Sequence, residues 1–281
     1  MEDQVNRLVE KAWTIFQSMR EGRRFMIAIG GIPGSGTILD HLHLTSLIEA
    51  SHLDYQPISV SCFKSTSYIS QQPTTNPQTG KTTLSQIVTQ ALNAKHAEQN
   101  PGADPIAAFV PMDGYHLTRA QLDAMPDPSN AHARRGAEFT FDGASFLALV
   151  RALHDPLSNT SKTIFAPSFD HAVKDPKEND IAILPSHRIV VFEGNYVVLD
   201  KEPWRAAARL MDERWFVDVD FAVARKRLVV RHVKAGIAAH EEAAGRRADE
   251  NDLVNGKQIV ENQFAVDETV ISREDTAWKH D

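Results

Sequence analysis

The chain has 281 residues, of which 42% are hydrophobic and 24% are charged, so it can bury the core of one large or two small domains. Its formal net charge of −7 argues against a general nucleic-acid binder, and its single cysteine excludes an internal disulfide framework. No stretch approaches the ~20 apolar residues of a membrane span and the N-terminus lacks an apolar signal core, so we expect a cytoplasmic protein without membrane contact.

The first two predicted elements are a helix and a strand. Apolar residues at helical spacing over residues 4–20 predict an amphipathic helix, and the apolar run at 24–30 predicts the first strand. That strand leads into Gly-Ile-Pro-Gly-Ser-Gly at residues 31–36, which is the glycine-rich half of a phosphate-binding loop. The other half, Lys-Thr-Thr, appears only at residues 81–83, where the helix expected over 82–97 begins.

Joining Gly36 to Lys81 gives GIPGSGKTTLSQIVTQALN, which contains the complete pattern G-x-x-x-x-G-K-[ST] between a strand and a helix. Glycines let backbone N–H groups close around phosphate oxygens, the lysine reaches the outer phosphates, and the hydroxyl meets Mg²⁺. The nucleotide-binding candidates in this motif are Gly31, Pro33, Gly34, Ser35, Gly36, Gly80, Lys81, Thr82 and Thr83.

A 44-residue stretch separates the two halves of the motif, running from Thr37 to Gly80 or equally from Gly36 to Thr79. It is rich in Ser and Thr, nearly uncharged and without a steady period, so we expect mostly loop, with a weak helix near 38–50. Our hypothesis is a segment foreign to the fold, such as a retained intron or a gene-model error. The alternative is a natural surface insertion, which loop-closure entropy tolerates.

Downstream of this stretch, apolar strands alternate with helices. We expect strands at 106–110, within 188–199 and at 214–221. Helices are expected at 143–154, 203–211, 222–236 and 239–263, the last with a break near Asn251. This alternation predicts an α/β fold with three layers, a mainly parallel sheet and helices on both faces. Ligands in such folds lie at the carboxyl ends of strands, where Gly31, Asp113 and Glu193 all fall.

Two acidic residues at predicted strand ends are candidates for chemistry. Asp113, in Pro-Met-Asp-Gly-Tyr-His, can accept a proton from an attacking hydroxyl or help to hold Mg²⁺, although a turn aspartate is common at such a place. His116 either orients the acceptor or is an ordinary loop histidine. Glu193 can hold a metal-bound water or pair with the phosphate-loop lysine, and Gly194 beside it allows close backbone approach.

Two basic segments are candidates for binding anions. Arg134 and Arg135 stand on a predicted loop and either bind an acidic substrate or form a solvated pair. Arg227 and Arg231 are four residues apart on a basic helix and share one face, from which they could close over a nucleotide; a solvated basic face is the alternative.

Six segments in order resemble the P-loop small-molecule kinases, the family of uridine kinase, pantothenate kinase and phosphoribulokinase. The segments are the joined GIPGSGKTT, PMDGYHL, RRGAEFTFD, FAPSFDH, FEGNYVVLD and RLVVRHVKAG, and the likeness covers residues 24–265 apart from the insertion. Glu138 and Phe139 depart from it, since family members often have Pro and an acid there. A C-terminal strand or tail at 266–281 and the helix at 1–23 flank the expected kinase domain.

The resemblance implies ATP, Mg²⁺ and transfer of the γ-phosphoryl group to a hydroxyl of a small metabolite. It places the catalytic base on Asp113, the phosphate lysine on Lys81, the metal hydroxyl on Thr82 and lid arginines at Arg227 and Arg231. It also implies an acceptor side over residues 116–142, and the substrate candidates are His116, Arg134, Arg135 and Tyr196. The alternative is a catalytically impaired relative in which the insertion disrupts the ATP-binding loop.

Overall fold

The structure is a computed structural model that describes residues 2–35 and 80–272. The predicted insertion, with the helix expected near 38–50, lies outside the described residues, except for its alternative last residue, Gly80. Gly36 and the end of the predicted tail, residues 273–281, also lie outside them. Within the described ranges no helix is both long enough and apolar enough to span a bilayer.

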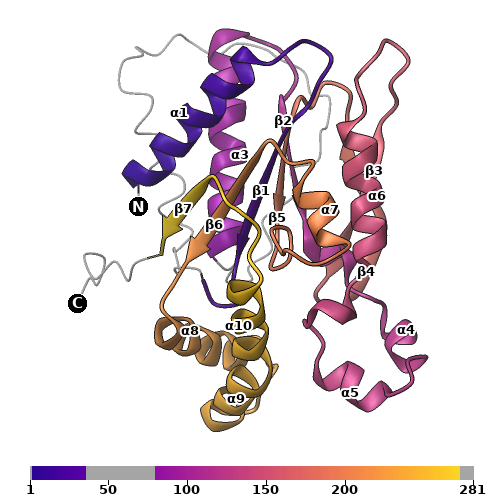
Figure 1. The fold of residues 1–281 in the computed structure, drawn as a ribbon, viewed down its shortest axis with the longest axis vertical. Coiled ribbons are helices and arrows are strands. Elements are labelled where there is room, and N and C mark those ends of the chain that lie inside the picture. Colours follow the sequence, from indigo (N-terminus) through magenta and orange to yellow (C-terminus); the bar gives the residue numbers. More distant parts are fainter. Residues whose placement is uncertain (1, 36–79, 273–281) are drawn as a thin grey trace, which may run out of the picture.

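A five-stranded sheet forms the centre of the fold, in the order β2-β5-β1-β6-β7 (Figure 1). Every pairing within it is parallel. All residues of β1 and β5 are buried, which explains why these strands are continuous apolar runs rather than alternating ones. The strands are β1 (Phe25–Gly31), β2 (Ala107–Pro111), β5 (Ile189–Glu193), β6 (Glu213–Asp218) and β7 (Glu268–Ile271).

The two faces of β1 pack against different helical layers. Phe25, Ile27 and Ile29 belong to a core cluster shared with α1 and α3, whereas Met26 and Ala28 belong to a cluster shared with α6 and α7. Because successive strand residues point to opposite faces, this division confirms the predicted three-layer α/β fold. The helices are α1 (Glu2–Ser18), α3 (Gly80–Gln99), α6 (Gly143–His154) and α7 (Trp204–Ala208).

A two-stranded antiparallel hairpin lies outside the main sheet and was not expected from the sequence. Its strands are β3 (Ile164–Asp170) and β4 (Asp175–Ile183), and it lies alongside α6 (Figure 1). The charged run at 174–180 masks the strand pattern, since little of β4 is buried. The hairpin packs against the 3₁₀ turn η2 (Met112–Tyr115), which follows β2.

Short elements connect η2 to α6, and a group of helices follows β6. The connecting elements are α4 (Arg119–Asp123), α5 (Pro128–Ala133) and the 3₁₀ turn η3 (Glu138–Thr140). The helical group is α8 (Phe221–Lys234), α9 (Glu241–Arg247), the π-helix η4 (Ala248–Asp252) and α10 (Leu253–Glu261). The break predicted near Asn251 is therefore a π-helical turn. In Figure 1, α8 to α10 and α4 to α5 flank the end of the sheet toward which β1 runs.

Candidate functional site

The two halves of the predicted phosphate loop meet in space. Lys81 Nζ donates to the Ile32 carbonyl oxygen at 3.1 Å and lies 3.5 Å from Ser35 Oγ. The lysine is only 3% exposed although it stands in the first turn of α3. Pro33 and Gly34 form the turn between β1 and Ser35. The strand-loop half and the helix half of the motif thus form one site.

Close packing explains why glycine occupies two positions of this loop. A Cβ at Gly31 would lie 2.8 Å from Lys81 Cδ and 2.9 Å from the Val217 carbonyl oxygen. Gly34 has φ +78°, and a Cβ there would lie 2.6 Å from the Ala224 carbonyl oxygen of α8. The loop backbone therefore touches both the lysine and α8, and a side chain at either position would open the site.

The N-terminus of α3 faces the same loop. Gly80, Thr82 and Thr83 lie with Lys81 in its first turn, where backbone N–H groups have no partner within the helix and favour an anion. A helix of 20 residues presents this end directly to the loop that follows β1. The backbone and the lysine together make a site suited to phosphate.

Thr82 and Glu193 bring two oxygen ligands together beside the loop. Thr82 Oγ1 donates to Glu193 Oε2 at 3.1 Å, and Glu193 stands at the end of β5, 7% exposed. Among the described residues no three His, Cys, Asp or Glu side chains form a metal cluster. A hydroxyl and a carboxylate do fit Mg²⁺ that is also held by nucleotide phosphates, because Mg²⁺ typically takes one or two protein ligands plus phosphate and water.

Burial shifts the pKa of both charged groups at this place. Burial lowers the pKa of Lys81 to about 8, an effect that the charges of Glu193 and Asp113 oppose and that of Arg231 reinforces. Burial raises the pKa of Glu193 to about 7, opposed by Lys81 and reinforced by Asp113. Lys81 therefore interacts with all three other charges, and the structure brings Asp113 to the same part of the site.

Asp113 stands in η2, immediately after β2, and its side chain is exposed. The strand that precedes Asp113, β2, pairs with β5, and Pro111 at its end lies opposite Glu193. Gly194 lets η2 approach closely, because a Cβ there would lie 2.4 Å from Met112 Cβ. Two adjacent parallel strands thus deliver two carboxylates to one edge, as the sequence predicted.

His116 is fixed behind Asp113 rather than free in a loop. Its Nδ1 lies 2.9 Å from the Asp113 carbonyl oxygen, and its ring packs against Phe141 and Phe169 with centroids 4.0 and 4.9 Å away. Burial lowers its pKa, which the charge of Asp113 opposes. A neutral imidazole in this aromatic stack is suited to contacting an acceptor.

The two predicted lid arginines point to different partners. Arg227 Nη1 donates to Ser272 Oγ at 2.9 Å, just beyond β7. Among the described residues Arg231 makes no hydrogen bond or ion pair, and burial lowers its pKa against the opposing charges of Asp252 and Asp113. Arg231 is therefore the member of the pair whose charge acts on Lys81 and Asp113.

Arg134 and Arg135 form hydrogen bonds with other residues of the chain. Arg134 donates from Nε to Asn251 Oδ1 and from Nη2 to Asn255 Oδ1, each at 2.8 Å. Arg135 Nη2 donates to Asp175 at 3.1 Å and to the Leu117 carbonyl at 3.0 Å. The sequence left open binding of an acidic substrate or a solvated charge pair, and the structure shows hydrogen bonds that connect the segment at 116–142 with the helices after β6 and with the hairpin.

Tyr196 packs beneath the loop that carries Arg134 and Arg135. The side chain is fully buried, and its hydroxyl donates to the Gly136 carbonyl at 2.8 Å. The sequence placed Tyr196 on the substrate side, but the structure places it under the loop rather than at a surface that a ligand could reach. Its contribution is to hold the turn that carries Arg134 and Arg135.

Several residues that the structure brings to this region were not predicted from the sequence to lie there. Asn251 and Asn255 are 4% and 2% exposed, and they reach Arg134 across more than 110 residues of sequence. Their spacing of four in a polar helix was an available signal of a shared face. Tyr115, in the middle of the Asp113 motif, was also passed over.

The chain is similar in sequence to proteins named as kinases. No family model matches the chain. An ATP-dependent kinase-like protein of Aspergillus versicolor, notR′, is 55% identical over 57% of this chain and 92% of its own length. A Schizosaccharomyces pombe protein whose name proposes a uridine kinase is 40% identical over 68% of this chain and 77% of its own length.

Two solved structures are similar over nearly the whole chain. One is a Silicibacter sp. TM1040 protein named for a kinase of a fructose transport system, with a TM-score of 0.67 and 26% identity over 94% of this chain and 98% of that chain. The other is YFH7 of Saccharomyces cerevisiae, named for a circularly permuted P-loop kinase, with a TM-score of 0.64 and 24% identity over 96% and 99%. The YFH7 likeness bears on the fold alone.

Proposed function

Because the chain belongs to the uridine kinase-like family of P-loop kinases, we propose that it transfers the γ-phosphoryl group of ATP to a hydroxyl of a small metabolite. The observation that carries the proposal is the contact of Lys81 Nζ with the loop at Ile32 and Ser35. That contact supports an ATP site in spite of the long stretch that interrupts the motif. Phosphoryl transfer asks mainly for positioning and charge stabilisation, and such a site supplies both.

Backbone groups and side chains would both bind the phosphates. The loop amides and the first turn of α3 would hold the phosphate oxygens, and Lys81 would neutralise charge on the outer phosphates. Thr82 and Glu193 would hold Mg²⁺, which supplies neutralisation of charge on the phosphates when bound. Arg231, whose guanidinium makes no hydrogen bond among the described residues, would add positive charge near the transferred group.

Asp113 would accept the proton of the acceptor hydroxyl. Its carboxylate is exposed on the turn after β2, and its charge acts on both Lys81 and Glu193. A base must reach the hydroxyl while standing beside the phosphate end, and the end of β2 meets both needs. His116, held by the Asp113 carbonyl, would orient the acceptor.

Two substitutions test these roles separately. Lys81→Ala should abolish detectable ATP binding, because it removes the buried cation of the loop. Asp113→Asn should leave ATP affinity within about threefold of the unchanged protein but lower transfer by about 10²–10⁴-fold, the range of general base catalysis. Calorimetry with ATP and a γ-phosphate transfer assay measure the two effects. Lys95→Ala, in the last part of α3 where Lys95 pairs with Glu10 of α1, is the control that should change neither.

The interrupted motif keeps a second candidate function open to test, a folded relative that has lost catalysis. Binding and transfer can be compared between the full chain and a chain lacking residues 37–80. Transfer by the full chain would support the kinase. Transfer by the shortened chain alone would support the hypothesis that the intervening segment is foreign to the fold.

A further inference from the structure

The helices α8 and α10 pack closely against the phosphate loop. A Cβ at Gly34 of the loop would lie 2.6 Å from the Ala224 carbonyl oxygen of α8, and a Cβ at Gly256 of α10 would lie 3.3 Å from Ile32 Cβ. Each glycine makes its contact with backbone atoms, because it has no side chain that could adapt. Close-packed contacts of this kind transmit a displacement rather than absorb it, so α8 and α10 must follow a change in the loop.

The same group of helices holds the turn that carries Arg134 and Arg135. Arg134 donates from Nε to Asn251 Oδ1 and from Nη2 to Asn255 Oδ1, each at 2.8 Å. Asn251 Nδ2 and Arg247 Nη2 both donate to the Arg135 carbonyl oxygen, at 3.3 and 3.4 Å. The turn is therefore attached to helices that also contact the phosphate loop.

Asn255 and Gly256 are neighbours on α10, so one turn of helix makes both contacts. Gly256 packs against the Ile32 side chain, and Asn255 accepts from Arg134. The Ile32 carbonyl oxygen is in turn the acceptor for Lys81 Nζ at 3.1 Å. Direct contacts thus connect the lysine of the phosphate loop, through α10, with the turn on the acceptor side.

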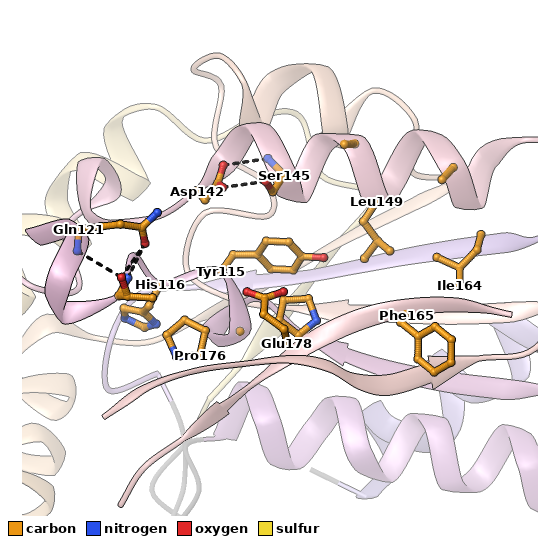
Figure 2. A pocket seen from close by; sticks show the side chains of 15 residues that line it. Tyr115, His116, Gln121, Asp142, Ser145, Leu149, Ile164, Phe165, Pro176 and Glu178 are labelled. Carbon is orange, nitrogen blue, oxygen red and sulfur yellow. Dashed lines mark hydrogen bonds between the residues drawn. The ribbon is translucent and has the colours of Figure 1, made fainter. Parts of the chain in front are cut away.

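The turn also contacts the wall of a hollow of about 390 Å³ between α6 and the β3–β4 hairpin. Arg135 Nη2 donates to the Leu117 carbonyl oxygen at 3.0 Å and to Asp175 of the hairpin at 3.1 Å. His116, which immediately precedes Leu117, lies beside Gln121 at one end of the hollow (Figure 2). A displacement of the turn would therefore reach side chains that line this hollow.

Lys81 supplies the two arrangements that a coupling between distant sites requires. In the structure its Nζ donates to the Ile32 carbonyl, and it forms no ion pair among the described residues. The proposed function gives the lysine a phosphate partner, and a charged phosphate oxygen is a stronger acceptor than a carbonyl. Phosphates that engage the lysine and the loop amides would fix the loop, and the helices packed on it would lose motion with it.

We propose that Asn255 and Arg134 are positioning residues that transmit nucleotide binding at the phosphate loop to the turn at 133–136, which opens less often when ATP is bound. The inference rests on the proposed function for nucleotide binding, whereas the path through α10 is separate from it. The hydrogen-bonded form of the turn predominates with and without nucleotide, so the coupling acts on a minor open form and changes ATP affinity little.

Amide hydrogen exchange of the full chain, with and without a non-hydrolysable ATP analogue and Mg²⁺, tests the proposal. The amides of Arg134, Arg135 and Ala137 donate to nearby carbonyl oxygens, so their exchange reports opening of the turn. The analogue should slow their exchange about fivefold or more, the lower end of typical couplings between sites. Binding of the analogue without slower exchange would contradict this inference alone, whereas absence of binding would contradict the proposed function as well.

Asn255→Ala isolates the path through α10. It removes the acceptor of Arg134 Nη2 and should reduce the slowing by the analogue to less than about twofold, with affinity for the analogue nearly unchanged. A purely structural role would speed exchange equally with and without the analogue, and an unaltered ratio would contradict the proposal. Asn255→Asp keeps an oxygen for Arg134 and should restore the slowing. Lys257→Ala, whose side chain on the same helix is 73% exposed, is the control that should leave the ratio unaltered.

Gly256→Ala tests the loop side of the path in the free protein. Its Cβ would lie 3.3 Å from Ile32 Cβ and 3.5 Å from Phe221 Cε1, so α10 must shift by a few tenths of an ångström. This shift strains the bonds of Asn255 with Arg134, and exchange of the turn should become about threefold faster. Gly102→Ala is the control, because nothing lies within 4 Å of a Cβ there. Equal exchange of the turn in the two variants would contradict the contact between the loop and α10 as the means of transmission.

Discussion

The cations of two regions differ in their hydrogen bonding: the region around Lys81, which we propose binds phosphate (the phosphate end), and the region at residues 116–142, which we propose faces the acceptor (the acceptor end). At the phosphate end, Lys81 bonds, within residues 2–35 and 80–272, only to a carbonyl and a hydroxyl, and it forms no ion pair with Glu193 although each charge acts on the other. At the acceptor end, Arg134 donates to two asparagines, and Arg135 donates from Nη2 to an aspartate and a carbonyl, although its buried Nε has no partner among the described residues. Lys81 thus has no ion-pair partner among the described residues, whereas Arg134 is held by both asparagines and Arg135 is paired with Asp175.

The comparison indicates that the hydrogen-bond partners of a cationic side chain, rather than its position near a sequence motif, decide whether it can bind a ligand. The phosphate end is assembled from the ends of parallel strands and the start of one helix. The acceptor end is assembled from a hairpin, short helices and a π-helical turn that the main sheet does not contain. Four predictions test the contrast, in order of expected effect.

Gly31→Ala should break the phosphate end. Its Cβ would lie 2.8 Å from Lys81 Cδ and 2.9 Å from the Val217 carbonyl, so the lysine or the strand must move. Overpacking of this kind costs about 1–3 kcal/mol, which converts to a loss of ATP affinity of up to about 100-fold. Gly102→Ala is the control for the clash, because nothing lies within 4 Å of a Cβ there; its φ of +83° adds a backbone strain that Gly31, which has no positive φ, does not have. Equal ATP affinities in the two variants would show that the loop tolerates a side chain.

Arg134→Lys should weaken the acceptor end without touching the phosphate end. A lysine keeps the charge but cannot reach both Asn251 and Asn255, so a buried carbonyl oxygen loses its donor. We expect the free energy of unfolding to fall by about 2 kcal/mol and the melting temperature by about 4–8 °C. ATP affinity should be unchanged. A fall in ATP affinity with no change in melting temperature would reverse the roles assigned to the two ends.

The pH dependence of ATP binding should report Lys81. Its pKa of about 8 in the free protein means that it loses its proton above pH 8, so ATP must recruit a proton as it binds. Affinity should then fall about tenfold between pH 7 and pH 9. The free energy of unfolding of the ATP-free protein should instead rise between about pH 8 and pH 10.5. In this range the unfolded chain still holds the Lys81 proton that the folded chain has lost. Lys81→Gln should bind weakly with a flat profile, and a steep profile in that variant would contradict the assignment.

Arg225→Ala should have the smallest effect. This arginine pairs with Asp249 at 2.7 Å, but each side chain is 46% exposed, so solvent screens the pair. We expect no measurable change in melting temperature or ATP affinity, which makes it a contrast to Arg134 among arginines that contact the π-helical region. A loss comparable to that of Arg134→Lys would show that exposure does not separate the two arginines.

Several features of the fold could be predicted because their causes are local. The strand at β1, the helix at α6 and the alternation of strands and helices follow from apolar runs and helical spacing within short windows. The position of Asp113 and Glu193 at neighbouring strand ends followed from the parallel sheet. The hairpin could not be predicted, because charged residues cover β4 and its partners lie in η2 and α6.

The sequence by itself determined which residue types meet at the phosphate end, since glycine, lysine and threonine in this order form the pattern of a phosphate-binding loop. Tertiary structure alone decided that the two halves meet, that Arg231 rather than Arg227 acts on Lys81, and that Tyr196 is buried. It also decided that Arg134 contacts asparagines more than 110 residues away. The physical reason is that a side chain's hydrogen bonds and desolvation depend on neighbours that only the folded chain supplies.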